Sequence, residues 1–553
     1  MKSNQKLNLA IKKLQENKFE ESLEIFSTLI NGNANDLNLL KYHIFCLIKL
    51  SRFEDAIVYL SKAIKIENNN IELLNNLAFC CQKVHNFLKA EQNYLKIIKI
   101  DSKNINAYLN LGSMFNQLNQ FDKTVALYDK LMVIDIDIPH SIYTNLSSSH
   151  IGLKNLIKAE EYAKKAFSIE DKDYKALINL SIIAIKKKNY ALATKYLEIA
   201  NSISPNDPLI LLNFGILNKD QENLEKALYY FDLSIKYNNQ NFRSYLYKGL
   251  VHLALNNFEQ GWKNYEYRWF IQKKRVLCEL PLWKSASNYK KILIWGEQGL
   301  GEQILFTTIL NDILSIFDSI TLLIDKKLKN ILKEIYPTIE VLSFDDHWSQ
   351  DNFDCQLPIA SLGYYFRNNI SSFIKKNNYE YKQVHKIKLN HKKVSCGISW
   401  KSINSVESDS KSMKLSNLKT LIEKFKDKVD FYDIQYTDEL EEINQFYNDT
   451  GIKIIQIDGL DKYNDLTSLS KLIKKFDFVI SISNTTAHLS ALLGIKTYVM
   501  LSKNIGKLWY WSNNLDSQNL WYPSAKIFRQ KEQGEWQAPI LDLTNEIANN
   551  LKT

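Results

Sequence analysis

A period of 34 residues runs through the first half of this 553-residue chain and restricts its fold more than any other feature. A bulky anchor residue returns in every copy. In most copies a small residue follows three positions later and a second bulky residue follows at the seventh position. The anchors are Phe19, Phe53, Phe87, Phe121, Leu156, Tyr190, Leu224 and Phe258. A unit of this length cannot bury its apolar face alone, so the copies must stack on one another.

Each unit divides into two segments with helical spacing, joined by a short turn such as Lys188-Asn189 or Asn256-Asn257. The small residues then lie where the two helices of a hairpin cross closely. In length and in its bulky/small/bulky signature the unit resembles the tetratricopeptide repeat. The resemblance covers about residues 1–270 in eight copies and implies a superhelix of helical hairpins.

An asparagine recurs eleven residues before most anchors, on the expected first helix of each hairpin. The candidate groove residues are Asn76, Asn110, Asn145, Asn179 and Asn213, and Asn8 shares their phase. A carboxamide offers both a donor and an acceptor, which suits the backbone of an extended peptide. A similar asparagine ladder in the O-GlcNAc transferases holds protein substrates. By that resemblance the repeats are expected to form a groove for a protein or peptide.

The 34-residue period stops within residues 271–290, which we interpret as a linker. From residue 291 onward, short apolar runs alternate with helical segments. The predicted strands are 292–295, 320–324, 394–400, 431–436, 452–457, 476–483 and 496–501. Such alternation predicts parallel sheets, and the pattern restarts near residue 394. The expected fold is therefore an α-solenoid over 1–270, followed by an α/β module with two Rossmann-like halves, 291–390 and 391–553.

Three turns in this second half carry residue types that bind phosphate. In parallel sheets, ligands bind beyond the carboxyl ends of the strands, where glycine turns and helix N-termini present free N–H groups. The first turn contains Gly299, Gly301 and Glu302, the second contains Lys401, Ser402 and Lys411, and the third contains Asn484, Thr485, Thr486 and His488. Helix capping alone would also explain Asn484 and Thr485.

Taken together, EQGLGEQILF, GISWKS, SNTTAHLSALLG and LWYPSAKIFRQ resemble the catalytic region of bacterial glycosyltransferases that join tetratricopeptide repeats to a heptosyltransferase-like GT-B module. The resemblance covers about residues 290–545. It implies an inverting, metal-independent transfer of a sugar from a nucleotide diphosphate donor. Glu302 stands where that family usually has Asp and is implied as the catalytic base. The other residues of the three turns are implied as the donor pocket.

Two rival functions stay open at this stage. In the first, the chain is a scaffold for protein–protein interaction whose glycosyltransferase-like module has lost catalysis, the change from Asp to Glu at residue 302 being a symptom. In the second, it is a transferase that acts on envelope or lipid-linked glycans, and the repeats serve assembly. The cluster Trp509, Trp511, Trp521, Tyr522 and Trp536 is interpreted first as packing of the final segment against the first α/β half.

Composition narrows the function classes further. The net charge of +10 comes from Lys residues interleaved with Asp and Glu, so no nucleic-acid partner is expected. The mean hydropathy of -0.28 and the lack of a long apolar run predict no transmembrane segment and a cytoplasmic location. The six cysteines have no disulfide or zinc spacing, and Asp135-Ile136-Asp137 falls between repeats, so no metal or cofactor is expected.

Overall fold

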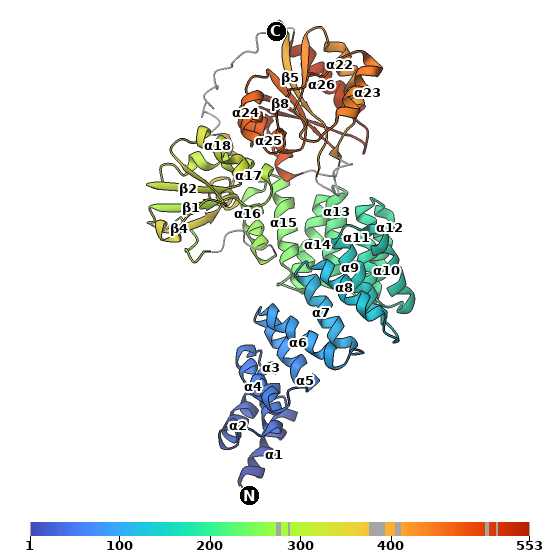
Figure 1. The fold of residues 1–553 in the computed structure, drawn as a ribbon, viewed down its shortest axis with the longest axis vertical. Helices are drawn as coiled ribbons and strands as arrows, with labels where there is room; N and C mark the ends of the chain where they lie inside the picture. The colour runs from blue at the N-terminus through green and yellow to red at the C-terminus, as the bar shows by residue number, and fades with distance from the viewer. Residues whose placement is uncertain are drawn as a thin grey trace. The chain divides into compact units, whose positions relative to one another are not determined.

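The computed structural model describes residues 2–271, 278–285, 288–374, 393–403, 411–503, 508–515 and 518–551. The chain separates into two compact units, Met1–Pro205 and Asn206–Thr553. The first unit consists of helical hairpins (Figure 1). The second contains two further hairpins and both parallel sheets.

Twelve helices of the first unit form six hairpins within its described residues, and each predicted anchor begins the second helix of its hairpin. The helices are α1 (Lys2–Gln15), α2 (Phe19–Gly32), α3 (Leu37–Lys49), α4 (Phe53–Ile66), α5 (Ile71–Lys83), α6 (Phe87–Ile100), α7 (Ile105–Gln117), α8 (Phe121–Met132), α9 (His140–Gly152), α10 (Leu156–Ile169), α11 (Tyr174–Lys186) and α12 (Tyr190–Ile203). The second unit opens with α13 (Pro208–Asp220), α14 (Leu224–Tyr237), α15 (Phe242–Ala254), α16 (Phe258–Tyr265) and the 3-10 turn η1 (Glu266–Phe270).

One backbone feature closes every hairpin. The residue two positions before each anchor takes a left-handed conformation, with φ between 57° and 64°. These residues are Asn17, Ser51, His85, Asn119, Lys154, Lys188, Glu222 and Asn256. A single left-handed residue after the first helix reverses the chain, the next residue is the N-cap, and the anchor starts the second helix. The turns predicted at Lys188 and Asn256 are confirmed.

The small residues of the repeat are fully buried, as their spacing predicts. They lie against the first helix of the same hairpin. Two copies have Ser22 or Thr124 where most have Ala, and in each the hydroxyl donates to a carbonyl of the first helix. The Ser22 hydroxyl donates to the carbonyl of Ala10 at 2.9 Å, and that of Thr124 donates to the carbonyl of Gly112 at 3.3 Å. The repeat therefore fixes helix spacing through side-chain size.

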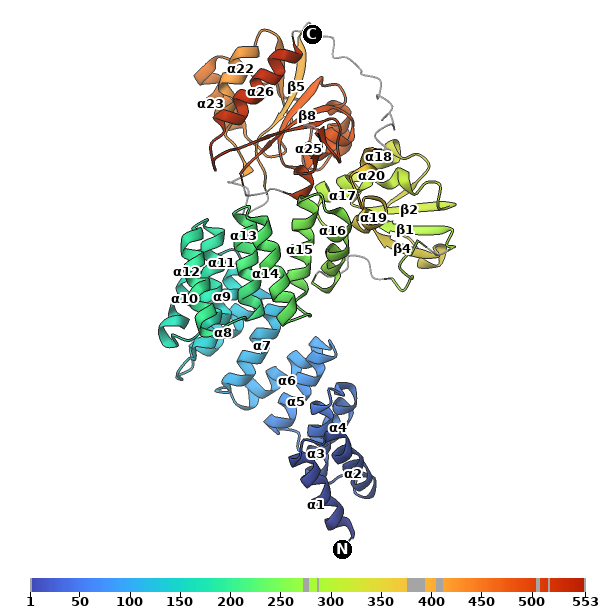
Figure 2. The ribbon, with the colours of Figure 1, turned by 180° about the vertical axis from the view of Figure 1, so that it is seen from behind.

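The first α/β half has four parallel strands in the order β3-β2-β1-β4. Ile292 and Ile294 of β1 pack on one face of the sheet, and Leu293 and Trp295 pack on the other. Figure 2 shows α19 and α20 beside β1, β2 and β4. The elements are β1 (Lys291–Trp295), α17 (Leu300–Thr307), η2 (Leu310–Asp312), β2 (Ser319–Ile324), α18 (Lys326–Ile335), β3 (Glu340–Ser343), η3 (Gln350–Asn352), β4 (Cys355–Pro358), η4 (Ile359–Ser361), α19 (Leu362–Phe366) and α20 (Ser371–Ile374).

The second half has five parallel strands in the order β11-β8-β7-β5-β6. Helices α22, α23 and α26 cover one face, and α24 and α25 cover the other (Figures 1 and 2). The elements are β5 (Val394–Ser399), η5 (Leu415–Leu418), α22 (Lys419–Phe425), β6 (Val429–Asp433), α23 (Leu440–Thr450), α24 (Leu466–Ile473), β7 (Phe478–Ile482), α25 (Thr485–Leu492), β8 (Lys496–Leu501), η6 (Trp509–Trp511), β9 (Asn514–Leu515), β10 (Gln518–Asn519), β11 (Ala525–Arg529) and α26 (Gln537–Asn550).

The prediction of a strand over 452–457 is wrong. Only Ile455 pairs with β6, through a hydrogen bond on each side: its N–H donates to Phe431 and its carbonyl accepts from Asp433, both at 2.8 Å. The chain then turns away through Gly459, which has a φ of 74°. Strands β3, β4 and β11 were not predicted, and two of them have only four residues.

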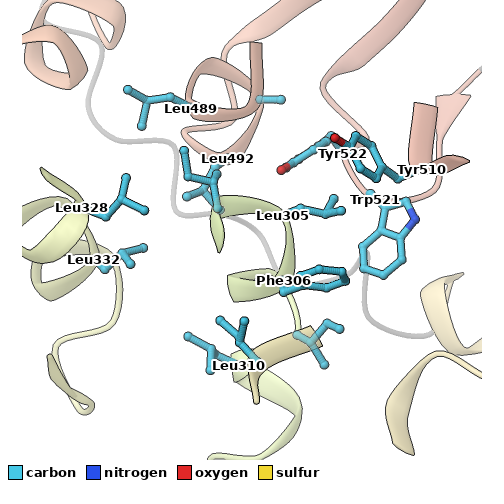
Figure 3. Close-up of a cluster of buried hydrophobic side chains, with 14 of the residues drawn as sticks. Leu305, Phe306, Leu310, Leu328, Leu332, Leu489, Leu492, Tyr510, Trp521 and Tyr522 are labelled. Atoms are coloured by element: carbon cyan, nitrogen blue, oxygen red, sulfur yellow. The ribbon is translucent and has the colours of Figure 1, made fainter. Parts of the chain in front are cut away.

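Trp262 of α16 joins the last hairpin to both α/β halves in one hydrophobic core. Its ring makes edge contacts with Phe306 of α17 and with Trp509 and Trp521, and its indole N–H donates to the carbonyl of Arg367 at 2.8 Å. The interpretation of Trp509 and Trp521 as packing residues is confirmed. Figure 3 shows the Phe306 ring facing Trp521 within this core.

Replacement of Trp262 by Ala removes the centre of this core and leaves the Arg367 carbonyl without its donor. We expect the free energy of unfolding of the second unit to fall by about 3–5 kcal/mol, measured by urea titration. Lys263→Ala, on the exposed face of the same helix, is the matched control and is expected to change it by less than about 0.5 kcal/mol. Equal effects of the two variants would contradict this role.

Candidate functional site

The predicted turns lie at the carboxyl ends of central strands of the two sheets. The turn with Gly299 and Gly301 follows β1, and the turn with Asn484 follows β7. Strand β7 lies next to β5, and the chain leaves β5 toward β6 on one side and reaches β7 on the other. Such a switch point is where open α/β sheets form a crevice for ligands.

A cavity of about 520 Å³ lies between these turns. The residues that line it come from both α/β halves, and nine of the ten predicted catalytic and donor-binding residues are among them. They are Gly299, Leu300, Gly301, Glu302, Ser402, Ile403, Lys411, Tyr436, Lys462, Tyr463, Leu466, Ser483, Asn484, Thr485, Thr486, His488, Leu508 and Tyr510. The three turns predicted from the sequence therefore line one cavity in the second unit.

Asn484 connects the start of α25 to the end of β5 at the switch point. Its side-chain oxygen accepts a hydrogen bond from the Ala487 N–H at 3.1 Å and caps α25, which confirms the predicted capping role. Its amide group donates to the Ser399 hydroxyl of β5 at 2.9 Å. The buried Gln435, which the sequence analysis missed, accepts from the same hydroxyl and from the backbone N–H groups of Trp400 and Lys401. Thr485 is the first residue of α25 and does not cap it.

Gly301 and His488 interlock the two halves of the module. A methyl group on Gly301 would lie 2.8 Å from Cδ2 and 3.2 Å from Nε2 of His488, closer than a side chain tolerates. Because residue 301 is Gly, α17 can pack directly on α25. Leu305 of α17 and Leu492 of α25 belong to one hydrophobic core, and both are labelled in Figure 3.

His488 is uncharged in this setting. Burial lowers the pKa of His488 to about 3, so the imidazole is neutral throughout the physiological range. Nδ1 lies 2.9 Å from the Tyr522 hydroxyl, and the ring is enclosed by the rings of Tyr510, Trp511 and Tyr522. When that hydroxyl donates to Nδ1, the imidazole proton is on Nε2. His488 can then meet a ligand as a neutral donor.

Glu302 is the third residue of α17, and its carboxylate folds back over the start of the helix. A methyl group on Gly299 would lie 3.0 Å from its Oε2. Burial raises the pKa of Glu302, whereas its own N–H, the nearby Lys411 and the N–H of Gly299 each lower it, and the net direction is upward. A carboxyl group with a raised pKa can act as a general base, and a carboxylate at this helix position can also cap the helix.

The lysines of the cavity differ from the predicted set. Lys401 does not line it: its ammonium pairs with Glu439 and with Glu442, the latter at 2.8 Å. Lys411 does line it and acts on Glu302. Lys462, which the sequence analysis missed, also lines it and pairs with Asp433. Lys401 follows a strand end, as predicted, but the carboxylates of Glu439 and Glu442 neutralise it.

Two helix N-termini point at the same cavity. The first residues of α17 and α25 both line it, together with the hydroxyl residues Ser402, Thr485 and Thr486. A helix N-terminus has unpaired N–H groups and a partial positive charge, so an anion is stabilised there. Two such termini and Lys411 can surround a group that carries more than one negative charge.

Residues at the end of the last repeat hold the glycine turn that follows β1. The buried guanidinium of Arg268, in η1, donates two hydrogen bonds of 2.8 Å to the carboxylate of Glu297, just before the glycine turn. Glu297 also accepts from the N–H of Ala360 at 3.1 Å. The Gln298 amide donates to the Tyr265 hydroxyl, and Gln298 has a left-handed backbone with a φ of 62°. No local sequence signal indicated this support, because its partners lie 29 or more residues apart.

Several side chains of the asparagine ladder form hydrogen bonds within the repeats themselves. Asn110 donates to Asn75 at 3.2 Å and Asn145 to the Tyr128 hydroxyl at 2.9 Å. Asn179 is buried and donates to Thr144 and Ser148 of α9, both at 3.0 Å. The buried Asn213 donates to its own helix at Leu209, at 2.7 Å. Asn76, Asn110 and Asn145 are half-buried, so these three retain surface for a partner.

Within the described part of the chain, no three His, Cys, Asp or Glu side chains gather in an arrangement suited to a metal ion. Asp135 and Asp137 lie in the connection between α8 and α9. None of the described helices has the length and apolar character needed to cross a bilayer.

Comparisons with known proteins support the repeats. A tetratricopeptide-repeat family model matches residues 140–173, which include α9 and α10. Protein FlbA of Caulobacter vibrioides is 23% identical over 321 residues, which are 52% of this chain and 52% of FlbA, so the chain spans about half of that relative's length. The chain thus carries tetratricopeptide repeats.

Two solved structures of repeat proteins are among those to which this chain is similar. A tetratricopeptide repeat protein from Parabacteroides merdae has a TM-score of 0.41 and 14% identity, and covers 45% of this chain and 98% of its own. The C-terminal part of a repeat protein from Cytophaga hutchinsonii has a TM-score of 0.33 and 15% identity, and covers 43% and 97%.

The Gly301–His488 contact can be tested by a double-mutant cycle. We expect Gly301→Ala to lower the free energy of unfolding by about 1–3 kcal/mol, because the added methyl group meets the imidazole. In the His488→Ala background the same change should cost less, with a coupling of about 0.5–3 kcal/mol. Gly32→Ala, which meets no atom within 4 Å, is the control. Additive effects would show that the two residues do not press on each other.

The raised pKa of Glu302 predicts a pH dependence of stability. The folded protein holds this proton more tightly than the unfolded chain, so stability is lost as pH rises from the ordinary value of 4.5 through the folded pKa. Glu302→Gln cannot ionise. We expect its melting temperature to match the wild type near about pH 4 and to exceed it near about pH 7. A variant that is less stable at neutral pH would mean that capping outweighs burial.

Proposed function

We propose that this chain is a glycosyltransferase that moves a sugar from a nucleotide diphosphate donor to an acceptor hydroxyl, on a protein held in part by the repeats. The observation that carries the proposal is the shared cavity, in which a carboxyl group with a raised pKa faces two helix N-termini and Lys411. Such a cavity holds both a base and anion-binding groups. Glycosyl transfer needs both.

In the proposed reaction the Glu302 carboxylate takes the proton of the acceptor hydroxyl. The acceptor oxygen then forms a bond to the anomeric carbon from the face opposite the leaving group, which inverts that carbon. The bond from the anomeric carbon to the diphosphate oxygen breaks, and its electron pair leaves with the nucleotide diphosphate. N–H groups of α25, Lys411 and the hydroxyls of Ser402, Thr485 and Thr486 stabilise this charge without a bound metal.

The cavity also offers a place for the nucleoside. Tyr436 and Tyr463 line it on the side of the second half, with ring centroids 6.3 Å apart. Lys327 lies over the Tyr463 ring, at 3.8 Å from its centroid. Aromatic faces of this kind can stack on a base, which is consistent with a nucleotide-linked donor.

The repeats support a role in protein interaction, and we extend this to the acceptor. The half-buried Asn76, Asn110 and Asn145, which share one phase in the first unit, are the proposed contacts to its backbone. A scaffold with an inactive module is the second candidate, and the fold-back of Glu302 over Gly299 favours it, because this carboxylate already serves the helix end. A transferase for envelope or lipid-linked glycans would leave these asparagines unused.

We expect Glu302→Gln to slow the release of nucleotide diphosphate from a donor by about 100-fold or more and to leave donor binding unchanged. The donor is first found by thermal stabilisation with UDP-, GDP- and ADP-linked hexoses, N-acetylhexosamines and heptoses, since a ligand of the folded state raises the melting temperature. The exposed Glu441→Gln is the control and keeps wild-type turnover.

Full turnover in Glu302→Gln would remove Glu302 as the base. A donor that stabilises the protein and is never consumed, with or without a protein acceptor, would favour the scaffold.

A further inference from the structure

Tyr510 has a hydroxyl group that the protein itself does not use. The residue lies in η6 and lines the cavity, although the sequence analysis did not select it. Its side chain is 2% exposed, and the hydroxyl oxygen is buried without a hydrogen-bond partner. A buried polar group left unpaired destabilises the folded protein. Such an exception in a cavity wall points to a partner that binds from the cavity.

Three aromatic side chains around Tyr510 are hydrogen-bonded, whereas the buried hydroxyl of Ser512 also has no partner among the described residues. The Trp511 indole N–H donates to the Ser483 hydroxyl at 2.9 Å, and the Trp521 indole N–H donates to Asn513 at 3.1 Å. The Tyr522 hydroxyl is bonded to His488 at 2.9 Å. Figure 3 shows Tyr510 and Tyr522 side by side above the hydrophobic core.

The Tyr510 ring is held in place from several sides. Its centroid lies 5.2 Å from that of His488, 5.4 Å from that of Trp509 and 5.5 Å from that of Trp511, all in edge-on arrangements. A ring fixed in this way presents its hydroxyl at one position. A ligand atom bound there would be located without further ordering of the side chain.

The hydroxyl is a donor at every physiological pH. Burial, followed by the charge of Glu302 and the phenols Tyr522 and Tyr265, raises the pKa of Tyr510 well above its ordinary value. Tyr510 therefore stays protonated and can donate to an oxygen. The Tyr510 ring lies against His488, which itself contacts Gly301, the residue before Glu302, so this donor lies on the side of the cavity that holds the carboxylate.

We propose that Tyr510 is a positioning residue that donates a hydrogen bond from its hydroxyl to an oxygen of the sugar ring of the bound donor, next to Glu302. The inference rests on the proposed function and deepens it. The diphosphate is assigned to the N-terminus of α25 and the hydroxyls beside it, on the second half, so the group nearest Glu302, on the first half, is the sugar that reacts with the acceptor. Tyr510 orients this sugar so that its anomeric carbon faces the acceptor oxygen.

Tyr510→Phe tests the assignment, because it removes only the hydroxyl. The dissociation constants are measured for the nucleotide-sugar that stabilises the wild type and for the matching nucleotide diphosphate alone. We expect the variant to bind the nucleotide-sugar about tenfold more weakly and the nucleotide diphosphate with unchanged affinity. The melting temperature of the ligand-free variant should equal or exceed that of the wild type, because an unpaired buried hydroxyl has been removed.

Tyr498→Phe is the matched control. Tyr498 is a buried tyrosine of β8 whose hydroxyl accepts a hydrogen bond from Asn550 at 3.3 Å, outside the cavity. We expect this variant to lose a little stability and to bind both ligands as the wild type does. The two variants therefore separate a hydroxyl that serves a ligand from one that serves the fold.

Wild-type affinity of Tyr510→Phe for the nucleotide-sugar would overturn the Tyr510 assignment and leave the proposed function standing. A lower melting temperature of the ligand-free variant would also overturn it, since the hydroxyl would then serve the protein. If no nucleotide or nucleotide-sugar of the panel stabilises the wild type, the proposed function fails, and the assignment of Tyr510 fails with it.

Discussion

The candidate site depends on the close contact between the backbone at Gly301 and the imidazole of His488. Gly301 lies in α17 of the first α/β half, and His488 lies in α25 of the second half. Each helix begins at the end of a strand, and each of the two residues stands near the start of its helix. Because residue 301 has no side chain, α17 can approach the imidazole of α25 closely, and the two helix N-termini reach one cavity. A single methyl group at residue 301 would push them apart, so the shape of the cavity depends on the smallest side chain in its wall.

The same contact explains why His488 is a poor choice for a cationic ligand group. To pack against Gly301 the ring must leave water, and burial keeps it neutral. Positive charge in the cavity comes instead from the lysines and helix ends that line it. Glu302 lies on α17, the helix that packs against His488, and burial there raises its pKa.

The last hairpin belongs to the α/β part as much as to the repeats. Arg268 and Glu297 form a buried ion pair, and breaking such a pair leaves an uncompensated charge in the interior. On the opposite side of the hairpin, Asn513 donates to the carbonyl of Leu253 at 2.7 Å. The chain therefore enters the first sheet through a segment that both α/β halves already hold, and the glycine turn after β1 is supported where its backbone is left-handed.

The sequence by itself determined the local features: the hairpins, the strand–turn–helix units and the residues that line the cavity from each turn. Periodicity and turn chemistry act over a few residues, so they can be read without a structure. Short strands such as β3 and β4, the ion pair that neutralises Lys401, and the roles of Lys462 and Tyr510 were decided only in the tertiary structure. Each depends on groups far apart in the chain that share a low-dielectric interior, and burial, which sets both their pKa values and their partners, has no local signature.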